Sequence, residues 1–346
     1  MPSLERVLVT GGSGFLGSHI VEKLLDDPIT SVAIISRNPR ARTEDDRISL
    51  HPANIASKEE VQAIFDAFRP QVVIHAASPK SVDTAAELIR TNVQGTRVLL
   101  ECAEACVDTR AFVYTSSDSA VEPSEEPLTE DQAKLYGENR HPNPYAMSKA
   151  VADAAVQASN CAKLRTAAIR IPGIYGERDN NLMPQLVSSV RKNEHKMQIG
   201  QNKKLFEFVY VGKAAEAHIL AARALLDPDT AIGVAGEAFF VSDGRAEPFF
   251  NFVRRCYAAM GHPVELNEVT VLPMMAMQMI ASVTEWAYSI FTLGTVTPKL
   301  RRQNMDYLDK SCCWSIEKAK NRLGYEPVAD QDAAIKRSME WAVTKS

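Results

Sequence analysis

The sequence lacks the features that would place it among secreted, metal-binding or membrane-spanning proteins. Its six cysteines in 346 residues show neither the paired spacing of a metal site nor the density of a small secreted scaffold, so we expect reduced thiols and a cytoplasmic protein. Cys102 and Cys106 could share a helix face, but no second pair of Cys or His accompanies them, and no metal is predicted. The opening residues contain acidic Glu5 and run straight into an apolar stretch, which is not typical of a signal peptide.

A large excess of one charge is also missing. The formal net charge is -4, which gives no reason to expect nucleic acid or another polyanion as a partner. Hydrophobic residues make up 45% of the chain and charged residues 24%, an ordinary composition for a globular protein. The length suits one large domain, or a nucleotide-binding domain that carries a smaller one.

Glycines interrupt an apolar run near the amino terminus, which reads VLVTGGSGFLGSHIVEKLL. Residues 7–9 predict a buried strand, and the apolar positions of residues 15–25 recur at helical spacing. The glycines fall between the two, where bare backbone N–H groups at a helix start can hold a pyrophosphate. Gly11 would allow the tight turn, Gly14 the approach of phosphate and Gly17 the packing of helix on strand. The pattern therefore predicts a dinucleotide site, against the alternative of a glycine turn without a ligand.

Short apolar strands alternate with amphipathic helices through the first half of the chain. Strands are expected near residues 31–36, 48–55, 71–78, 111–117 and 165–176, with helices through 65, over 92–105 and from 145 through 158. This order specifies an α/β fold, a doubly wound parallel sheet of the Rossmann type. We expect residues 1–180 to bind NAD(P) and 181–346 to form a smaller substrate-binding portion, with segments near 205–220 and 236–244 returning to the Rossmann core.

The stretch PYAMSKA carries the most specific chemical signal. Tyr145 and Lys149 share one helix face, so the ammonium can lie near the phenol and favour the phenolate, which makes a general base. Ser117 ends the strand AFVYTSS, at the crevice where such folds bind ligands, and could hydrogen-bond the same substrate oxygen. Spacing alone would equally suit a solvated helix face, but with the glycine loop the three residues predict a catalytic set.

These motifs resemble a known family. The segments TGGSGFLG, HAAS, TNVQGT, YTSS and YAMSK, in that order, are similar to those of the extended short-chain dehydrogenases/reductases. The segments RIPGIYG, IGQNKKLFEFVYVGKAAEAHILAA, GEAFFVSDG and SIEKAKNRLGYEP narrow the resemblance to the 3β-hydroxysteroid dehydrogenase branch, especially the decarboxylating sterol-4α-carboxylate 3-dehydrogenases. The resemblance covers nearly the whole chain. It implies interconversion of a secondary alcohol and a ketone on a steroid, sterol or terpenoid-like substrate, with loss of a C4 carboxylate left open.

The resemblance also implies which residues hold the cofactor. Asn92 would support the active-site helix, and His75 and His218 are interpreted as structural. The expected cofactor-binding residues are Gly11, Ser13, Gly14, Phe15, Leu16, Gly17, Ser36, Arg37, Asn54, Ile55, Ala76, Ala77, Ser78, Asn92, Thr115, Tyr145, Lys149, Pro172, Gly173 and Ile174. Asn54 stands where the family usually has Asp, which leaves recognition of the adenine less well defined.

The second strand departs from the family's NAD enzymes. Ser36 occupies the place of the acidic residue that binds the adenosine ribose hydroxyls, and Arg37 follows it. A carboxylate there would repel a 2′-phosphate, whereas arginine can pair with one. NADP(H) is therefore favoured, and NAD(H) stays open because Arg37 could instead stack on adenine or face solvent.

Two other functions remain as alternatives. A dinucleotide-sensing protein without turnover would need no activated tyrosine, so the set of Ser117, Tyr145 and Lys149 argues against it. A nucleotide-sugar epimerase or dehydratase would need polar groups for a diphosphate, whereas residues 269–293 are largely apolar.

Residues 271–293 form an apolar stretch whose role the sequence leaves open. Pro273, Gln278 and Glu285 make it a poor membrane-spanning helix. On a helix, Gln278, Ser282, Glu285 and Ser289 form a narrow polar stripe. The helix could cover the substrate as a methionine-rich lid, the preferred interpretation, or lie on an internal membrane with Trp286 and Tyr288 as anchors and Lys299, Arg301 and Arg302 nearby. Plain burial or a contact between subunits of a homodimer is the third alternative.

Overall fold

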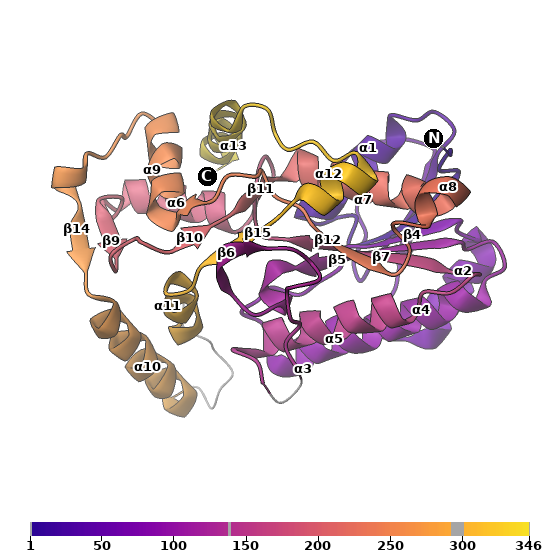
Figure 1. Ribbon diagram of the computed structural model, residues 1–346, viewed down its shortest axis with the longest axis horizontal. Helices are drawn as coiled ribbons and strands as arrows, with labels where there is room; N and C mark the ends of the chain where they lie inside the picture. Colours follow the sequence, from indigo (N-terminus) through magenta and orange to yellow (C-terminus); the bar gives the residue numbers. More distant parts are fainter. Residues whose placement is uncertain (1, 138–139, 292–300, 346) are drawn as a thin grey trace.

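A seven-stranded parallel sheet forms the centre of the molecule (Figure 1). The computed structural model describes residues 2–137, 140–291 and 301–345. In spatial order β12-β7-β5-β4-β1-β2-β3, the strands are β12 (Glu237–Phe240), β7 (Arg165–Ile171), β5 (Ala111–Ser117), β4 (Val72–His75), β1 (Arg6–Thr10), β2 (Ser31–Ser36) and β3 (Ile48–Pro52). The strand order reverses between β1 and β4, which is where folds of this kind bind their ligands. The expected doubly wound α/β fold is confirmed.

Helices cover both faces of this sheet because most of the connections between its parallel strands contain a helix (Figure 1). One face packs against α1 (Phe15–Leu25) and α7 (Val211–Leu226), with the short helices α8 (Pro228–Ala231) and α12 (Glu317–Leu323) nearby. The other face carries α2 (Lys58–Phe68), α4 (Thr96–Ala105) and α5 (Pro144–Ala158). Two apolar cores result, one on each face of the sheet.

The segment before α4 differs from the single helix that the sequence predicts. It begins as α3 (Ala85–Leu88), widens into a π-helical stretch over Ile89–Gly95 and returns to α-helix at Thr96. Such wide turns often occur at functional sites. Here the stretch carries Asn92, whose side chain donates a hydrogen bond to the Ser148 hydroxyl of α5 at 3.0 Å. The π-helical turn thus ties the middle of this helix to α5.

Smaller elements build a second layer beyond the carboxyl ends of the central strands. A four-stranded sheet joins β13 (Glu247–Pro248), β10 (Leu205–Phe206), β15 (Cys312–Trp314) and β6 (Ser124–Leu128). Two further pairs join β8 (Gly173–Tyr175) to β11 (Phe208–Tyr210) and β9 (Met197–Ile199) to β14 (Thr270–Leu272). The helices here are α6 (Leu182–Arg191), α9 (Phe249–Ala259), α10 (Met274–Phe291), α11 (Arg302–Leu308) and α13 (Gln331–Lys345). They enclose a third apolar core.

Helix α10 contacts the rest of the described chain mainly through α11. Its Met275 and Met279 are 77% and 66% exposed, so the interpretation of a buried helix is wrong for this side of α10. None of the helices in the described ranges combines the length and apolar character needed to cross a bilayer. Leu293 and Lys299, which entered the sequence-based argument, lie outside the described residues, as does the side chain of Ser289.

Candidate active site

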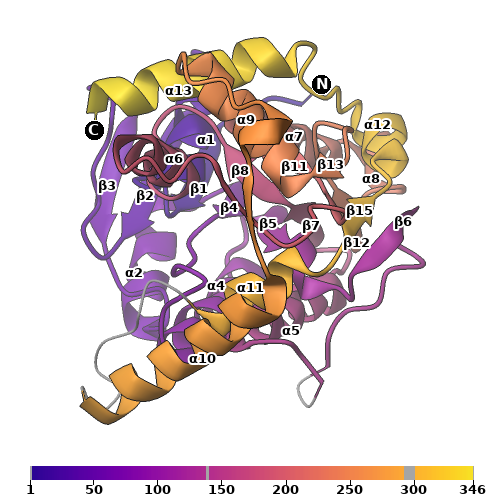
Figure 2. The ribbon, with the colours of Figure 1, turned by 90° about the vertical axis from the view of Figure 1, so that its left-hand side faces the viewer.

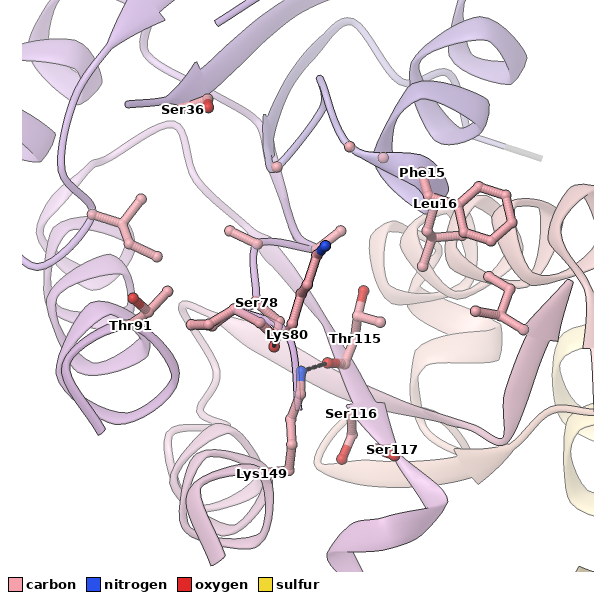
Figure 3. A pocket seen from close by; sticks show the side chains of 18 of the residues that line it. Phe15, Leu16, Ser36, Ser78, Lys80, Thr91, Thr115, Ser116, Ser117 and Lys149 are labelled. Atoms are coloured by element: carbon pink, nitrogen blue, oxygen red, sulfur yellow. Dashed lines mark hydrogen bonds between the residues drawn. The ribbon is translucent and has the colours of Figure 1, made fainter. Parts of the chain in front are cut away.

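A cleft of about 480 Å³ opens at the carboxyl ends of the central strands (Figure 3). Its walls come from the segments that follow β1, β2, β4, β5 and β7, which are far apart in sequence and meet because parallel strands end at the same edge. Figure 3 shows Ser36 at one end of the cleft and Ser117 with Lys149 toward the other. An elongated ligand could therefore contact both ends at once.

The glycine loop forms the floor of the cleft, and its geometry excludes side chains. Gly11 has φ +71° and passes so close to the segment after β4 that a Cβ would lie 2.8 Å from Ala77 Cα. A Cβ on Gly17 would lie 2.1 Å from the Gly11 carbonyl oxygen. No side chain caps α1, and its first turn has no acidic residue, so the first N–H groups of the helix remain available for an anion. These features fit the pyrophosphate of a dinucleotide.

Helix α5 starts so that Tyr145 lies in its first turn. The Asn143 side chain accepts a hydrogen bond from the Ala146 N–H at 2.9 Å, and Pro144 occupies the first helical position, which its fixed φ favours. Tyr145 and Lys149 both line the cleft, on the same face of the helix. The cap therefore sets where the phenol and the ammonium enter the site.

Lys149 is buried and bonded to the neighbouring strand. Its ammonium donates a hydrogen bond to the Thr115 carbonyl oxygen at 2.8 Å, the dashed line in Figure 3, and lies 5.0 Å from the centre of the Tyr114 ring. Burial lowers the pKa of Lys149 to about 7, against the opposing effect of the Asp153 carboxylate. The lysine can thus lose or gain its charge close to neutral pH.

Asp153 is itself fixed by a buried network behind the site. Its carboxylate accepts hydrogen bonds from Arg170 at 2.9 and 3.0 Å and from the Ser116 hydroxyl at 2.5 Å. The Asp153 and Arg170 side chains are 0% and 4% exposed. Removing one partner of such a pair would leave an uncompensated buried charge, so the network holds α5 firmly against β5 and β7.

Tyr145 is in its neutral form in this arrangement. Burial raises the pKa of Tyr145 to about 12, while a hydrogen bond with Ser117 lowers it and the charge of Asp118 raises it. The expectation that the Lys149 ammonium lowers the pKa of Tyr145 is wrong for the protein without a bound cofactor. The ammonium bonds to the Thr115 carbonyl oxygen, and burial has the largest effect on the pKa of the phenol. The site presents a phenol that can donate a proton.

The opposite end of the cleft contains a charge cluster that was not predicted from the sequence. Arg37 is 71% exposed and pairs with the Glu87 carboxylate at 3.0 Å, instead of standing alone after Ser36. Glu87 also binds Arg90 and accepts a hydrogen bond from the Thr91 hydroxyl at 3.3 Å. An anion that approaches Arg37 would therefore compete with Glu87.

Most of the predicted cofactor and catalytic residues come together in the cleft. Those that line it are Gly11, Gly14, Phe15, Leu16, Gly17, Ser36, Arg37, Asn54, Ile55, Ala76, Ala77, Ser78, Thr115, Ser117, Tyr145, Lys149, Pro172 and Ile174. Ser13, Asn92 and Gly173 lie outside its lining. The Ser13 hydroxyl bonds to the backbone of Arg40, and a Cβ on Gly173 would lie 3.1 Å from the Phe208 ring.

The cleft also has lining residues that the sequence argument did not select. They are Ile35, Ala53, Pro79, Lys80, Glu87, Thr91, Ser116, Ile171 and Asn180. Several of these residues are next in sequence to a predicted one, so they could have been predicted from their position at the end of a strand. Glu87 and Thr91 come from the helix that begins with α3, and only the fold brings that helix to the end of β2.

Two buried histidines support the cleft from behind. His75 bonds to the Thr10 and Thr96 hydroxyls at 2.6 and 3.0 Å, and burial lowers its pKa to about 3, as expected of a structural residue. His218 bonds to the Thr115 hydroxyl at 2.8 Å, and burial lowers its pKa to about 4. Both imidazoles are neutral at physiological pH, and His218 fixes the strand residue whose carbonyl binds Lys149.

Comparison with known proteins identifies sequence relatives over nearly the whole chain. The model of the 3-beta hydroxysteroid dehydrogenase/isomerase family matches residues 8–274. The decarboxylating sterol-4-alpha-carboxylate 3-dehydrogenase of Gibberella zeae is 55% identical over 293 residues, 84% of this chain and 97% of that protein. The Schizosaccharomyces pombe protein of the same description is 30% identical and covers 99% of this chain and 98% of that protein.

Solved structures of similar fold are more distant in sequence. The UDP-glucose 4-epimerase of Thermus thermophilus, solved in complex with NAD, has a TM-score of 0.73 and 22% identity, covering 99% of this chain and 100% of that one. An epimerase from Methanothermobacter thermautotrophicus has a TM-score of 0.77 and 19% identity, covering 99% and 93%. At this identity the likeness concerns the fold.

Proposed function

This chain belongs to the 3-beta hydroxysteroid dehydrogenase/isomerase family and is an NAD(P)-dependent oxidoreductase that acts on CH–OH groups. We propose that it oxidises the 3β-type alcohol of a sterol that carries a carboxylate on the neighbouring carbon. Relatives named as decarboxylating sterol-4-alpha-carboxylate 3-dehydrogenases support this substrate. The observation that carries the proposal is the meeting of Ser117, Tyr145 and Lys149 in one cleft with the glycine loop.

We propose that the glycine loop and the start of α1 hold the pyrophosphate, and that the segment after β7 flanks the nicotinamide. When bound, the oxidised nicotinamide would supply the acceptor for a hydride from the alcohol carbon. Tyr145 exchanges the proton of the alcohol oxygen, and Ser117 hydrogen-bonds the same oxygen as charge develops there. Because burial keeps Tyr145 neutral, the phenol is ready to donate in the reduction direction and must first lose its proton in the oxidation direction.

Decarboxylation would follow from the chemistry of the oxidised substrate. Oxidation beside a carboxylate gives a β-keto acid, in which the bond to the carboxylate carbon can break. Its electron pair passes into the ketone to form an enolate, carbon dioxide leaves, and the enolate carbon then takes a proton. Hydrogen-bond donors that face the ketone oxygen stabilise the enolate, and in this site the proposed donors are Ser117 and Tyr145.

For the cofactor, we propose a preference for NADP(H). Ser36 brings no negative charge to the end of β2, and Arg37 follows it with an exposed guanidinium that could pair with a 2′-phosphate. The ion pair between Arg37 and Glu87 acts against this preference, because a phosphate must displace the Glu87 carboxylate or tolerate it. The preference should therefore be modest, with NAD(H) still usable.

We further propose that residues 1–180 form the NAD(P)-binding part and that most of 181–346 shapes the substrate site, with α7 and β12 belonging to the Rossmann core. Phe206, Phe249 and Met274 help to line a second cavity of about 470 Å³ in the later part of the chain. These apolar side chains suit a polycyclic lipid, although Lys203, Lys204 and Asp309 also line the cavity, so its lining alone does not decide against a sugar diphosphate.

The test uses purified protein with NADP⁺ or NAD⁺ and a panel of polycyclic 3-alcohols with and without the neighbouring carboxylate. We expect the carboxylated alcohol to yield a ketone whose mass is lower by one carbon dioxide and two hydrogens. Turnover of a UDP-sugar, with no turnover of any polycyclic alcohol, would overturn the proposal in favour of an epimerase. Cofactor binding without turnover of any substrate would favour a sensor.

A further inference from the structure

The loop that follows β8, residues 176–181, contains a residue in an unfavourable backbone conformation. Arg178 has φ +71°, in the left-handed region that is uncommon for residues other than glycine. A residue keeps such a conformation only where its surroundings hold it there, and such residues are concentrated at functional sites. This loop adjoins the candidate active site, because Asn180 lines the cleft.

Two side chains of α1 hold Arg178 in place. The Arg178 guanidinium donates hydrogen bonds to both carboxylate oxygens of Glu22, one of them at 2.6 Å, and lies 2.9 Å from Nδ1 of His19. The other ring nitrogen of His19 donates to the Glu177 carbonyl oxygen at 2.8 Å. The Arg178 side chain is 18% exposed, and a two-point contact with a carboxylate is a strong form of ion pair. We call Arg178, Glu22 and His19 the α1 clamp.

Glu177, the residue before Arg178, ties the same loop to the later part of the chain. Its carboxylate accepts a hydrogen bond from the Tyr210 hydroxyl at 2.8 Å and pairs with Arg337 of α13 at 3.5 Å. The Arg337 guanidinium also lies over the Tyr210 ring, 5.4 Å from its centre. Helix α13 runs along the top of the molecule in Figure 2, where it packs on α6 and α9. The loop is therefore fixed between α1 and the C-terminal helix.

These contacts join two walls of the cleft. The Asp179 carboxylate accepts a hydrogen bond from the Met183 N–H at 2.9 Å, at the start of α6. Asn180 thus follows two fixed residues, and its exposed side chain belongs to the cleft lining. On the other side of the clamp, the His19 ring centre lies 6.0 Å from that of Phe15, which lines the cleft at the start of α1 (Figure 3).

We propose that Arg178 is a positioning residue for the cofactor: through the α1 clamp it holds residues 176–181 against the nicotinamide half of NAD(P)(H) and slows the release of the cofactor. This inference rests on the proposed function for the place of the nicotinamide, beside Pro172 and Ile174. The Asn180 amide can both donate and accept hydrogen bonds, which suits the carboxamide and ribose of that half. Because the start of α1 is proposed to hold the pyrophosphate, one helix would position both parts of the cofactor.

Arg69 provides a matched comparison within the same chain. It also has a positive φ, +51°, and it pairs with the Asp108 carboxylate at 2.7 Å. Arg69 lies between the end of α2 and the start of β4, at the amino ends of the central strands, and it does not line the cleft. In both arginines, replacement by glycine removes an ion pair and relieves the backbone. The two replacements therefore differ mainly in their distance from the cofactor.

The test measures NADPH and NADH binding to the full chain by fluorescence titration, and release by stopped-flow displacement with excess oxidised cofactor. We expect Arg178→Gly to raise the dissociation constant by about tenfold, mainly through faster release, and Arg69→Gly to leave it unchanged. ADP, which lacks the nicotinamide half, should bind Arg178→Gly and the unaltered protein equally. Glu22→Gln should weaken NADPH binding in the same direction, and adding it to Arg178→Gly should cause little further loss, because the two residues act as one unit.

NADPH binding and release at the unaltered rates in Arg178→Gly would overturn the proposal, even if the melting temperature fell, because the clamp would then only stabilise the fold. Equal weakening of ADP and NADPH would contradict it, as would additive effects of Arg178→Gly and Glu22→Gln. If the unaltered protein bound neither NADPH nor NADH, the proposed function would fail together with this inference. Because binding requires no sterol, the result does not depend on the identity of the substrate.

Discussion

The Ser117 hydroxyl donates a hydrogen bond to the carboxylate of its neighbour Asp118 at 3.2 Å. The same Ser117 oxygen accepts a hydrogen bond from the Ser119 N–H at 3.1 Å. Asp118 is 4% exposed, and the Trp314 side chain is close enough to its carboxylate to oppose the effect of burial on its pKa. While Asp118 is ionised, it therefore competes with a substrate oxygen for the Ser117 proton.

This contact predicts a pH dependence of ketone reduction. Burial raises the pKa of Asp118 to about 6, so the carboxylate becomes neutral as the pH falls through that value and releases the Ser117 proton. We expect kcat/KM for reduction to rise from pH 7 to pH 5 with an inflection near 6. In Asp118→Asn, which cannot titrate, this inflection should be absent. An unchanged inflection in the variant would assign it to another group.

Tyr145→Phe should preserve the fold and cofactor affinity but lower kcat by at least about a hundredfold, the loss expected when a positioned acid or base is removed. Lys149→Met keeps the apolar stem but removes the hydrogen bond to Thr115, so it should lower both kcat and cofactor affinity. Steady-state kinetics and fluorescence titration with NADPH separate the two effects. Near-normal turnover of the tyrosine variant would contradict the mechanism.

The pair of Arg37 and Glu87 predicts a change of cofactor preference. Glu87→Gln should tighten NADPH binding and leave NADH binding nearly unchanged, because only the 2′-phosphate uses the guanidinium that the substitution releases. Ser36→Asp should shift the preference toward NADH by adding a carboxylate at the end of β2. Dissociation constants for both cofactors measure the effect. If Glu87→Gln raised the affinity for NADPH and NADH equally, the pair of Arg37 and Glu87 would not be in contact with the 2′-phosphate.

Gly17→Ala tests the tight packing of the glycine loop. The new Cβ would lie 2.1 Å from the Gly11 carbonyl oxygen, so the backbone must move, and we expect the free energy of unfolding to fall by about 1–3 kcal/mol. Affinity for either cofactor should fall as well. Gly137→Ala is the control, because a Cβ there meets nothing within 4 Å and should change stability by less than about 0.5 kcal/mol. Equal melting temperatures for the two variants would argue against the loop geometry.

The central fold could be predicted because the strand and helix patterns along the sequence match the order of strands and helices that a parallel sheet requires. Buried strands such as Ala111–Ser117 begin with a continuous apolar run, and parallel strands leave the residues that follow them at one edge. For this reason Ser117 and Lys149 could be expected to meet near the glycine loop, although they come from separate elements.

Features that depend on three-dimensional contacts could not be predicted in the same way. Burial reverses the expected direction of the Tyr145 pKa, and Lys149 bonds to a backbone carbonyl that no sequence pattern marks. The pairing of Arg37 with Glu87 joins residues 50 positions apart. The polar stripe of α10 was visible in the sequence, but which side faces the protein depends on where α11 packs.

Transfer of deuterium from the substrate shows whether this chain oxidises a carboxylated sterol by moving a hydride to the cofactor. A carboxylated sterol labelled with deuterium at the alcohol carbon is incubated with the protein and oxidised cofactor, and both products are analysed by mass. We predict that the reduced cofactor carries the deuterium, that the ketone has lost it together with carbon dioxide, and that Tyr145→Phe forms neither product at a comparable rate. Recovery of the label in the sterol, with no labelled cofactor released, would contradict this prediction.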